Sequence, residues 1–143
     1  MKLITRNTDY ALRAICFIAE SGKEVVSVSS LFEALGVPRP FLRKILQILH
    51  NHGVLKSWRG KSGGFSLLRG PKTIFLWDIM RIFQGRFCLN ECFLRKRLCP
   101  NIKKCILRGK INRIEKYVFS ELKEITIDCL LGHSKIKKIV IRR

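Results

Sequence analysis

The stretch VPRPFLRKILQILHNHGVLKSWRGKSGGFSLL, residues 37–68, constrains the fold more than any other part of the sequence. Its first half places Leu42, Ile45, Leu46 and Leu49 at the spacing of one apolar helix face, which predicts a helix over residues 38–52. Its second half has two short apolar runs around the glycine-rich basic turn 59–64, which predicts a β-hairpin. We therefore expect a helix followed directly by a small two-stranded sheet.

Two further amphipathic helices are predicted upstream. We expect Asn7 or Thr8 to cap the first of them, and Ser27 to cap the second, which ends at Gly36. Two helices joined by a tight turn that contains glycine form a helix-turn-helix. With the hairpin as a wing, residues 1–85 are predicted to form a mainly α, winged helix-turn-helix DNA-binding domain.

The helix over 38–52 has a polar face as well as an apolar one. The second helix of such a pair lies in the major groove, where Arg pairs with guanine and Gln with adenine. Glycines in a wing let the backbone approach a phosphate closely. An ordinary solvated polar face would show the same periodicity, but the hairpin that follows favours DNA. The residues predicted to contact double-stranded DNA are Arg39, Arg43, Lys44 and Gln47 in the helix and Arg59, Lys61, Ser62 and Gly63 in the turn.

The charge balance agrees with a polyanionic partner. A formal net charge of +19 is typical of proteins that bind phosphate backbones or anionic membranes, and ribosomal proteins share it. No apolar run approaches the roughly 18 residues that span a bilayer, and the amino terminus lacks an apolar signal region, so we expect a cytoplasmic chain with no membrane partner. No nucleophile–base constellation is present, so we do not expect an enzyme.

Four of the six cysteines fall between residues 88 and 105. Because a cytoplasmic chain keeps its thiols reduced, this clustering indicates metal or redox chemistry. The spacing of Cys92, Cys99 and Cys105 matches neither a zinc ribbon nor a ferredoxin motif. Neighbouring Lys and Arg side chains favour thiolates, which suit an iron–sulfur cluster and zinc equally well. Reduced thiols without any ligand are the remaining alternative, and Cys16 and Cys129 are expected only to pack.

One long helix is predicted over residues 107–131. Its apolar positions recur every three or four residues, and a helix of roughly 35 Å is too long for so small a protein to cover. This pattern predicts homodimerisation, with two winged helices facing two DNA half-sites, although the helix could instead fold back on its own domain. The apolar positions are Ile111, Ile114, Val118, Leu122, Ile125 and Cys129, and residues 132–143 form a basic tail.

The motif TDYALRA and the stretch from Val37 to Ile79 resemble the Rrf-two family of bacterial winged-helix transcriptional regulators, most specifically in SWRGKSGGFSLLRGP. The resemblance runs over about residues 1–130. It implies a dimeric DNA binder, usually a repressor, that senses redox state, nitric oxide or iron–sulfur status. It also implies that residues 86–106 form a loop in which Cys92, Cys99 and Cys105 hold a 2Fe-2S or 4Fe-4S cluster.

The fourth cluster ligand departs from the relatives. IscR-type members use a histidine three residues after the last cysteine, where this chain has Arg108. Cys88 is the preferred candidate, because thiolate is the ordinary cluster ligand. Asp9 of the partner subunit is the alternative, since NsrR-type members can use an acidic residue near the amino terminus of the partner. Two other functions stay open: a regulator of the same fold with a thiol switch or zinc, and a basic protein associated with RNA or the ribosome.

Overall fold

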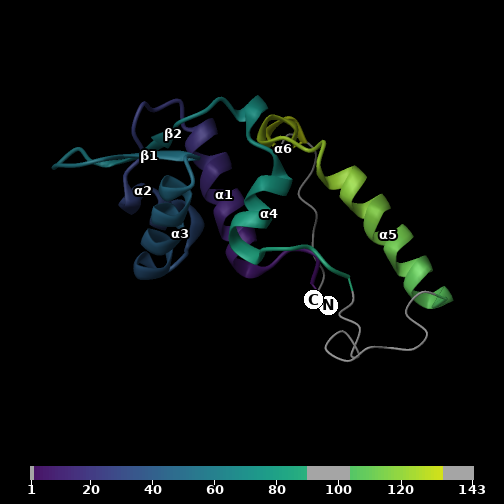
Figure 1. The fold of residues 1–143 in the computed structure, drawn as a ribbon. Coiled ribbons are helices and arrows are strands. Elements are labelled where there is room, and N and C mark those ends of the chain that lie inside the picture. Colours follow the sequence, from purple (N-terminus) through teal and green to yellow (C-terminus); the bar gives the residue numbers. More distant parts are fainter. Residues whose placement is uncertain (1, 90–103, 134–143) are drawn as a thin grey trace, which may run out of the picture.

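The computed structural model describes residues 2–89 and 104–133. The fold is mainly helical with one antiparallel hairpin, as predicted. Figure 1 shows α1 to α4 and the hairpin forming one body from which α5 projects. In chain order the elements are α1 (Arg6–Glu20), α2 (Val28–Leu35), α3 (Arg39–Asn51), β1 (Leu55–Trp58), β2 (Gly64–Leu67), the 3₁₀ helix η1 (Pro71–Thr73), α4 (Leu76–Gln84), α5 (Ile106–Leu122) and α6 (Ile127–His133).

The apolar face of α3 lies in the main core. Leu42, Ile45, Leu46 and Leu49 are all at most 2% exposed, which confirms the predicted helix and its orientation. They pack with buried residues of α1 and with Leu31 of α2. The polar side of α3 is therefore turned to solvent.

α2, the first helix of the helix-turn-helix, begins and ends where the sequence predicts. Ser27 caps α2, because its side-chain oxygen accepts a hydrogen bond of 3.1 Å from the backbone N–H of Ser30. Gly36 ends the helix with φ +64°, a conformation that glycine adopts without steric cost. Both predictions are confirmed.

The predicted cap of α1 is wrong. Thr5 caps this helix, with its hydroxyl oxygen 3.5 Å from the backbone N–H of Thr8. Thr8 itself is fully buried, and its hydroxyl donates to Oε1 of Gln84 at 2.8 Å. Thr8 therefore joins α1 to the end of α4, a long-range contact that local sequence patterns do not reveal.

The hairpin is tied to the start of the helix-turn-helix. Its strands pair from Leu55–Leu67 to Trp58–Gly64. Val26 and Phe65 then exchange two backbone hydrogen bonds of 2.9 Å, which form an isolated antiparallel bridge beside β2. At Gly64 the two backbone segments approach so closely that a Cβ atom would lie 2.2 Å from the carbonyl oxygen of Val26.

The prediction of one helix over 107–131 is wrong. The chain leaves helical geometry after Leu122 and resumes it at Ile127. Between them, the carbonyl of Ile125 accepts a 2.8 Å hydrogen bond from the N–H of Leu76, and the N–H of Ile127 donates to the carbonyl of Ile74 at 2.9 Å. This bridge replaces helical hydrogen bonds, and the hydroxyl of Thr126 then caps α6.

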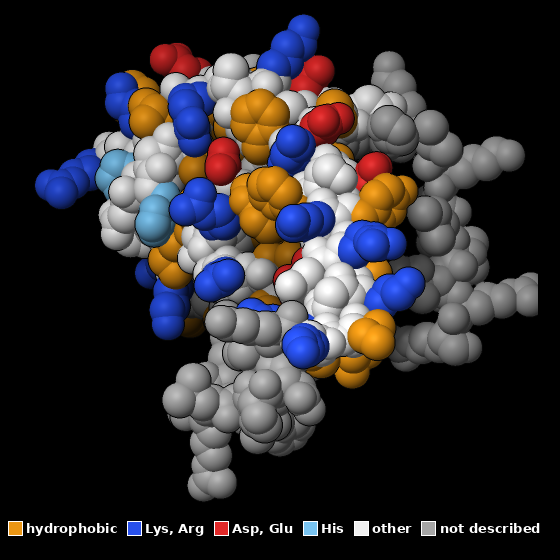
Figure 2. Space-filling view, turned by 45° about the vertical axis from the view of Figure 1, so that its right-hand side comes forward, with side chains coloured by type: hydrophobic (Ala, Val, Ile, Leu, Met, Phe, Trp, Pro, Cys, Tyr) orange, Lys and Arg blue, Asp and Glu red, His pale blue; other side chains and the backbone are white. Residues whose placement is uncertain are grey.

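The two helices that result have different surroundings. α6 folds back onto α1 and η1, with Ile127 fully buried, as the fold-back alternative requires. α5 instead carries exposed apolar side chains, including Leu107 and Tyr117, each 66% exposed. Figure 2 shows hydrophobic side chains exposed among Lys and Arg side chains on this side of the molecule. In the described ranges, no helix is both long and apolar enough to cross a membrane.

The close approach at Gly64 predicts a large effect of a small substitution. Gly64→Ala should lower the free energy of unfolding by about 1–3 kcal/mol, because the added methyl group must push the backbone of Val26 away from β2. Gly70→Ala is the matched control, since a Cβ there meets nothing within 4 Å. Urea unfolding followed by circular dichroism measures both, and equal stability of the two variants would contradict the prediction.

Candidate nucleic-acid interface and cysteine segment

The four residues of α3 predicted to contact DNA share one solvent-exposed face: Arg39, Arg43, Lys44 and Gln47. They begin at the first residue of α3, so Arg39 lies at the helix N-terminus that a helix-turn-helix protein brings nearest the bases. Within residues 2–89 and 104–133, none of the three cations forms an ion pair or a hydrogen bond through its side chain. Their positive charge is therefore available to a polyanion.

Two of these side chains have neighbours that restrict them. The guanidinium carbon of Arg39 lies 5.0 Å from the ring centroid of Phe32 in α2. Nε2 of Gln47 donates a 3.0 Å hydrogen bond to Oδ1 of Asn51, one turn further along α3. A Gln amide keeps a second N–H and a carbonyl oxygen for a base, so Gln47 and Asn51 present a joined polar surface. Neither Phe32 nor Asn51 is predicted from the sequence to belong to this surface.

The wing turn has the shape that its glycines predict. Gly60 adopts φ +102°, and the N–H of Gly63 donates to the carbonyl of Gly60 at 3.0 Å. A Cβ at Gly63 would lie 2.5 Å from the carbonyl oxygen of Trp58, so this position requires glycine. Arg59, Lys61 and Ser62 are exposed at the end of the hairpin, which extends away from the helices in Figure 1.

The hairpin also exposes a hydrogen-bonded surface that is not among the predicted DNA contacts. Nε1 of Trp58 donates a 2.9 Å hydrogen bond to the hydroxyl of Ser66 on the opposite strand. The ammonium group of Lys56 lies 4.0 Å from the centroid of the Trp58 ring. Alternation along β1 places Lys56 and Trp58 on one face, and that alternation was the signal that could have identified them.

The cysteine segment, residues 86–106, lies within the described ranges only at its two ends, residues 86–89 and 104–106. Cys92 and Cys99 lie outside the described residues. Cys105 is the N-cap of α5, and its exposed sulfur accepts a 3.4 Å hydrogen bond from the backbone N–H of Arg108. The positive end of the helix dipole therefore faces this sulfur.

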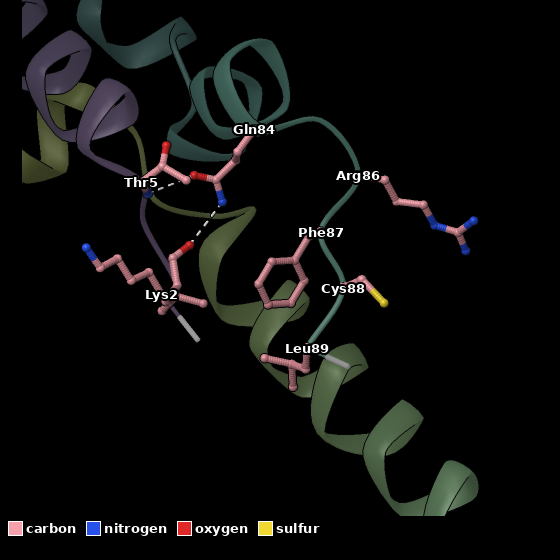
Figure 3. A pocket seen from close by; sticks show the side chains of 8 residues that line it. Lys2, Thr5, Gln84, Arg86, Phe87, Cys88 and Leu89 are labelled. Carbon is pink, nitrogen blue, oxygen red and sulfur yellow. Dashed lines mark hydrogen bonds between the residues drawn. The ribbon is translucent and has the colours of Figure 1, made fainter. Parts of the chain in front are cut away.

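Cys88 lies in the segment that leaves α4. It is half-buried and contributes to a small pocket of about 190 Å³ (Figure 3), lined by Lys2, Leu3, Thr5, Gln84, Arg86, Phe87, Cys88 and Leu89. Phe87 and Cys88 point to opposite sides of this segment in Figure 3. The N–H of Leu89 donates a 2.7 Å hydrogen bond to Oε1 of Glu115, halfway along α5.

The same segment packs against α4 and α5 through aromatic rings. The rings of Phe87 and Phe119 both meet Trp77 edge-on, with centroids 5.8 Å and 4.5 Å from that of the indole. Cys105 stands ten residues before Glu115, about 15 Å along the helix axis. The described geometry thus places Cys88 beside the middle of α5 and Cys105 at its beginning.

Asp9, the other candidate fourth ligand, lies on the first turn of α1. Its Oδ2 forms an ion pair of 3.0 Å with Nε of Arg13, and its side chain is 45% exposed. A partly exposed carboxylate can approach a second chain, although Arg13 would compete with a metal for it. Among residues 2–89 and 104–133, no three Cys, His, Asp or Glu side chains come together as a metal site.

Gln84 joins the amino terminus to the start of the cysteine segment, a role that no local sequence pattern predicts. Its Oε1 accepts hydrogen bonds from the N–H of Thr5 at 3.1 Å and the hydroxyl of Thr8 at 2.8 Å. Its Nε2 donates to the carbonyl of Leu3 at 3.0 Å, as Figure 3 shows. The last residue of α4 therefore holds the first turn of α1 in place. One of its partners, Thr8, immediately precedes Asp9.

The two cysteines expected only to pack differ in their surroundings. Cys16 is half-buried against the main core, and burial together with nearby Glu20 raises the pKa of its thiol to about 11. Cys129 is exposed, so the expectation that it packs is wrong. Hydrogen bonds from Thr126 lower the pKa of Cys129, with the hydroxyl 3.2 Å from its sulfur.

These thiols should react with iodoacetamide at different rates. Because only thiolate reacts, Cys129 should be alkylated at pH 8 at least about tenfold faster than Cys16, whose rate should rise only as the pH approaches its raised pKa. Mass spectrometry of the two peptides measures the rates, and protein unfolded in urea is the control in which they should converge. Equal rates in the folded protein would contradict the prediction.

Comparisons with known proteins assign the family. The Rrf2 family, described as an iron-dependent transcriptional regulator, matches residues 4–133. Protein aau3 of Rhizobium meliloti is 32% identical over 129 residues, which cover 90% of this chain and 84% of that protein. The HTH-type transcriptional regulator NsrR of Bacillus licheniformis is 28% identical over 143 residues, covering 98% of this chain and 99% of that protein.

A solved structure agrees with this assignment. The structure of CymR, the global cysteine regulator of B. subtilis, is similar with a TM-score of 0.78 at 25% identity, covering 93% of this chain and 98% of that one. The two proteins therefore share the same fold over most of both chains. The chain belongs to the Rrf2 family of transcriptional regulators, which are DNA-binding proteins and not enzymes.

Proposed function

We propose that this regulator is a homodimeric repressor that senses redox state, nitric oxide or iron–sulfur status through a cluster in its cysteine segment. The observation that carries the DNA contact is the exposed row of cations on α3, beside a wing whose tip is also basic. None of the cations on that face is neutralised by a described side chain. Membership of a transcriptional regulator family favours duplex DNA over structured RNA as the partner.

The proposed DNA contacts are of two types, contacts to base edges and contacts to phosphates. Arg39, Arg43 and Gln47 at the exposed face of α3 have the side chains that pair with base edges in the major groove. Lys44 and the wing residues Arg59, Lys61, Ser62 and Gly63 suit phosphate contacts, because the glycine turn brings backbone and cations close to the DNA backbone. α3 would therefore supply specificity, and the wing would supply affinity that depends on salt.

Dimerisation is proposed through α5. Ile106, Leu107, Ile114 and Tyr117 are between 53% and 80% exposed, an unusual concentration of apolar surface on one helix. A second copy of the chain would cover these side chains and place two winged domains on two half-sites. α6 folds back on its own chain, so it would take no part in the dimer interface formed by α5.

An iron–sulfur cluster fits the donors that the chain offers. Cys105 exposes its sulfur at the start of α5, and Cys92 and Cys99 precede it on the same segment. Thiolates are the ordinary ligands of such clusters, and a bound cluster would supply one-electron redox chemistry. The fourth ligand is Cys88, or Asp9 of the partner subunit. A thiol switch or a zinc ion in the same cysteines is the second candidate.

The signal would reach the DNA-binding domain through the two described ends of the segment. Cys105 caps α5, and Leu89 is hydrogen-bonded to Glu115 of the same helix. Gln84 links the segment to the start of α1, which packs against α3. A cluster state would change DNA binding only if it favours one placement of α5 and α1 over another.

The wing contact is tested by Arg59→Ala. This variant should weaken operator binding and lower the slope of log K against log salt by about one, because one phosphate contact is lost. Arg81→Ala is the matched control: Arg81 is an exposed arginine on α4, which lies away from the hairpin in Figure 1. Fluorescence anisotropy at several salt concentrations gives the slopes. An unchanged slope for Arg59→Ala would remove the wing from the interface.

The cluster is tested by anaerobic purification. The protein should be brown, with iron and acid-labile sulfide in similar amounts, and Cys92→Ala should abolish the charge-transfer absorbance because one thiolate ligand is lost. Cys129→Ala, which removes an exposed thiol outside the segment, should keep it. Colourless, iron-free protein would refute the cluster, and zinc in its place would favour the second candidate.

The fourth ligand is decided in the same preparation. Cys88→Ala and Asp9→Ala should differ, since only the variant that lacks the true ligand should lose the cluster more quickly on exposure to air. Arg13→Gln removes the ion pair but keeps the Asp9 carboxylate, so it separates a ligand role of Asp9 from the ion pair: the cluster should persist in this variant if Asp9 is the ligand.

A further inference from the structure

A cation at the start of α3 lies against an aromatic ring of α2. The guanidinium carbon of Arg39 lies 5.0 Å from the ring centroid of Phe32. We propose that Phe32 positions the Arg39 side chain for contact with a base pair and is therefore a specificity determinant of the operator complex. This inference rests on the proposed function, in which Arg39 contacts DNA.

The backbone around both residues is fixed independently of DNA. The N–H of Gly36 donates to the carbonyl of Phe32 at 2.9 Å, and Gly36 then turns the chain with φ +64°. Val37 is buried at 2% exposure, and Pro38 and Pro40 flank Arg39. Because proline restricts its own φ and the residue before it, Arg39 begins α3 with little backbone freedom.

The Phe32 ring is itself anchored. It is half-buried and packs against the main core, so one part of the side chain is immobilised while another part faces Arg39. A free arginine side chain loses much conformational freedom when it contacts a ligand. A ring beneath the guanidinium restricts that freedom before binding. The N–H donors of Arg39 form no hydrogen bond with described residues, so they remain available for a bidentate pair with guanine.

The other cations of this face lack such support. In the part of the chain that the structure describes, cations lie over rings at Arg39, Lys56 and Lys123. Lys56 is in the wing and Lys123 follows α5, so Arg39 is the supported cation of α3. Arg43 and Lys44, one turn further on, would order only when DNA is present. Phe32 should therefore influence the base pair that Arg39 contacts and not those of its neighbours.

The test is a double-mutant cycle between Phe32→Leu and Arg39→Ala in the full chain. The probe is a duplex selected by the native protein from a randomised library, together with variants that carry each single base-pair change. Phe32→Leu should weaken binding roughly two- to fivefold, the size expected for one exposed cation–ring contact. The loss should fall on the base pairs at which Arg39→Ala loses discrimination, and it should vanish in the Arg39→Ala background.

Three controls separate positioning from packing. Phe83→Leu makes the same change at a half-buried phenylalanine of α4 that packs on the same core, and it should leave base preference unchanged. Phe32→Tyr keeps a ring and should restore native preference. Phe32→Met, an unringed side chain of similar volume, should reproduce the loss if Phe32→Leu does not fold, with thermal melts reporting folding.

The outcomes are distinct. An equal loss from Phe32→Leu in the native and Arg39→Ala backgrounds would show that the ring serves only packing and would overturn the inference. If Phe32→Leu lowers the affinity for the operator and for a random duplex equally, Arg39 contacts a phosphate and not a base, and the inference is overturned. If Arg39→Ala leaves operator binding unchanged, the proposed contact of Arg39 itself is wrong, whatever Phe32→Leu does.

Discussion

The buried face of α1 is the constraint on which the other elements depend. Ala11 and Ala14 are fully buried, and their small side chains allow neighbouring helices to approach closely. α2, α3, α4 and α6 all contact α1, as does β2 of the wing. Figure 1 shows α1 between α3 on one side and α4 on the other. A shift of α1 would therefore displace both α3, the proposed DNA-binding helix, and the start of the cysteine segment.

The cysteine segment is connected to this centre at defined points. Both side-chain amide atoms of Gln84 form hydrogen bonds with residues 3, 5 and 8. Phe87 and Leu89 follow, and Leu89 is hydrogen-bonded to α5. The two flanks of the segment meet the same helix, one at Glu115 and one at the N-cap Cys105. A chemical change among the cysteines would thus act on α5 and on the first turn of α1, which carries Asp9.

The proposed DNA-binding surface combines two kinds of cation. Arg39 and Lys56 lie against the rings of Phe32 and Trp58, which limit their motion before DNA arrives. Arg43, Lys44 and Lys61 have no partner within the described ranges and would contribute charge without a fixed direction. Fixed donors favour recognition of particular bases, whereas mobile charges favour affinity for any duplex.

The sequence by itself determined the elements whose signals are local. Three features were predictable because each depends on neighbours within one or two turns: the apolar spacing of α3, the Ser27 and Gly36 ends of α2, and the wing with its glycines. Tertiary structure decided the rest. Thr5 replaces Asn7 or Thr8 as the cap, because Gln84 takes the Thr8 hydroxyl.

The last helix shows the physical reason most clearly. Its apolar periodicity continues without interruption through Ile125 and Cys129, so the sequence indicates a single helix. Residues 74–76 interrupt it, since their backbone groups form hydrogen bonds with Ile125 and Ile127 from about fifty positions earlier in the chain. The contact of Arg39 with Phe32 likewise required the α2–α3 turn to be folded. Apolar periodicity in the sequence predicts which face a segment buries. Which residues its backbone and its cations contact depends on the tertiary structure.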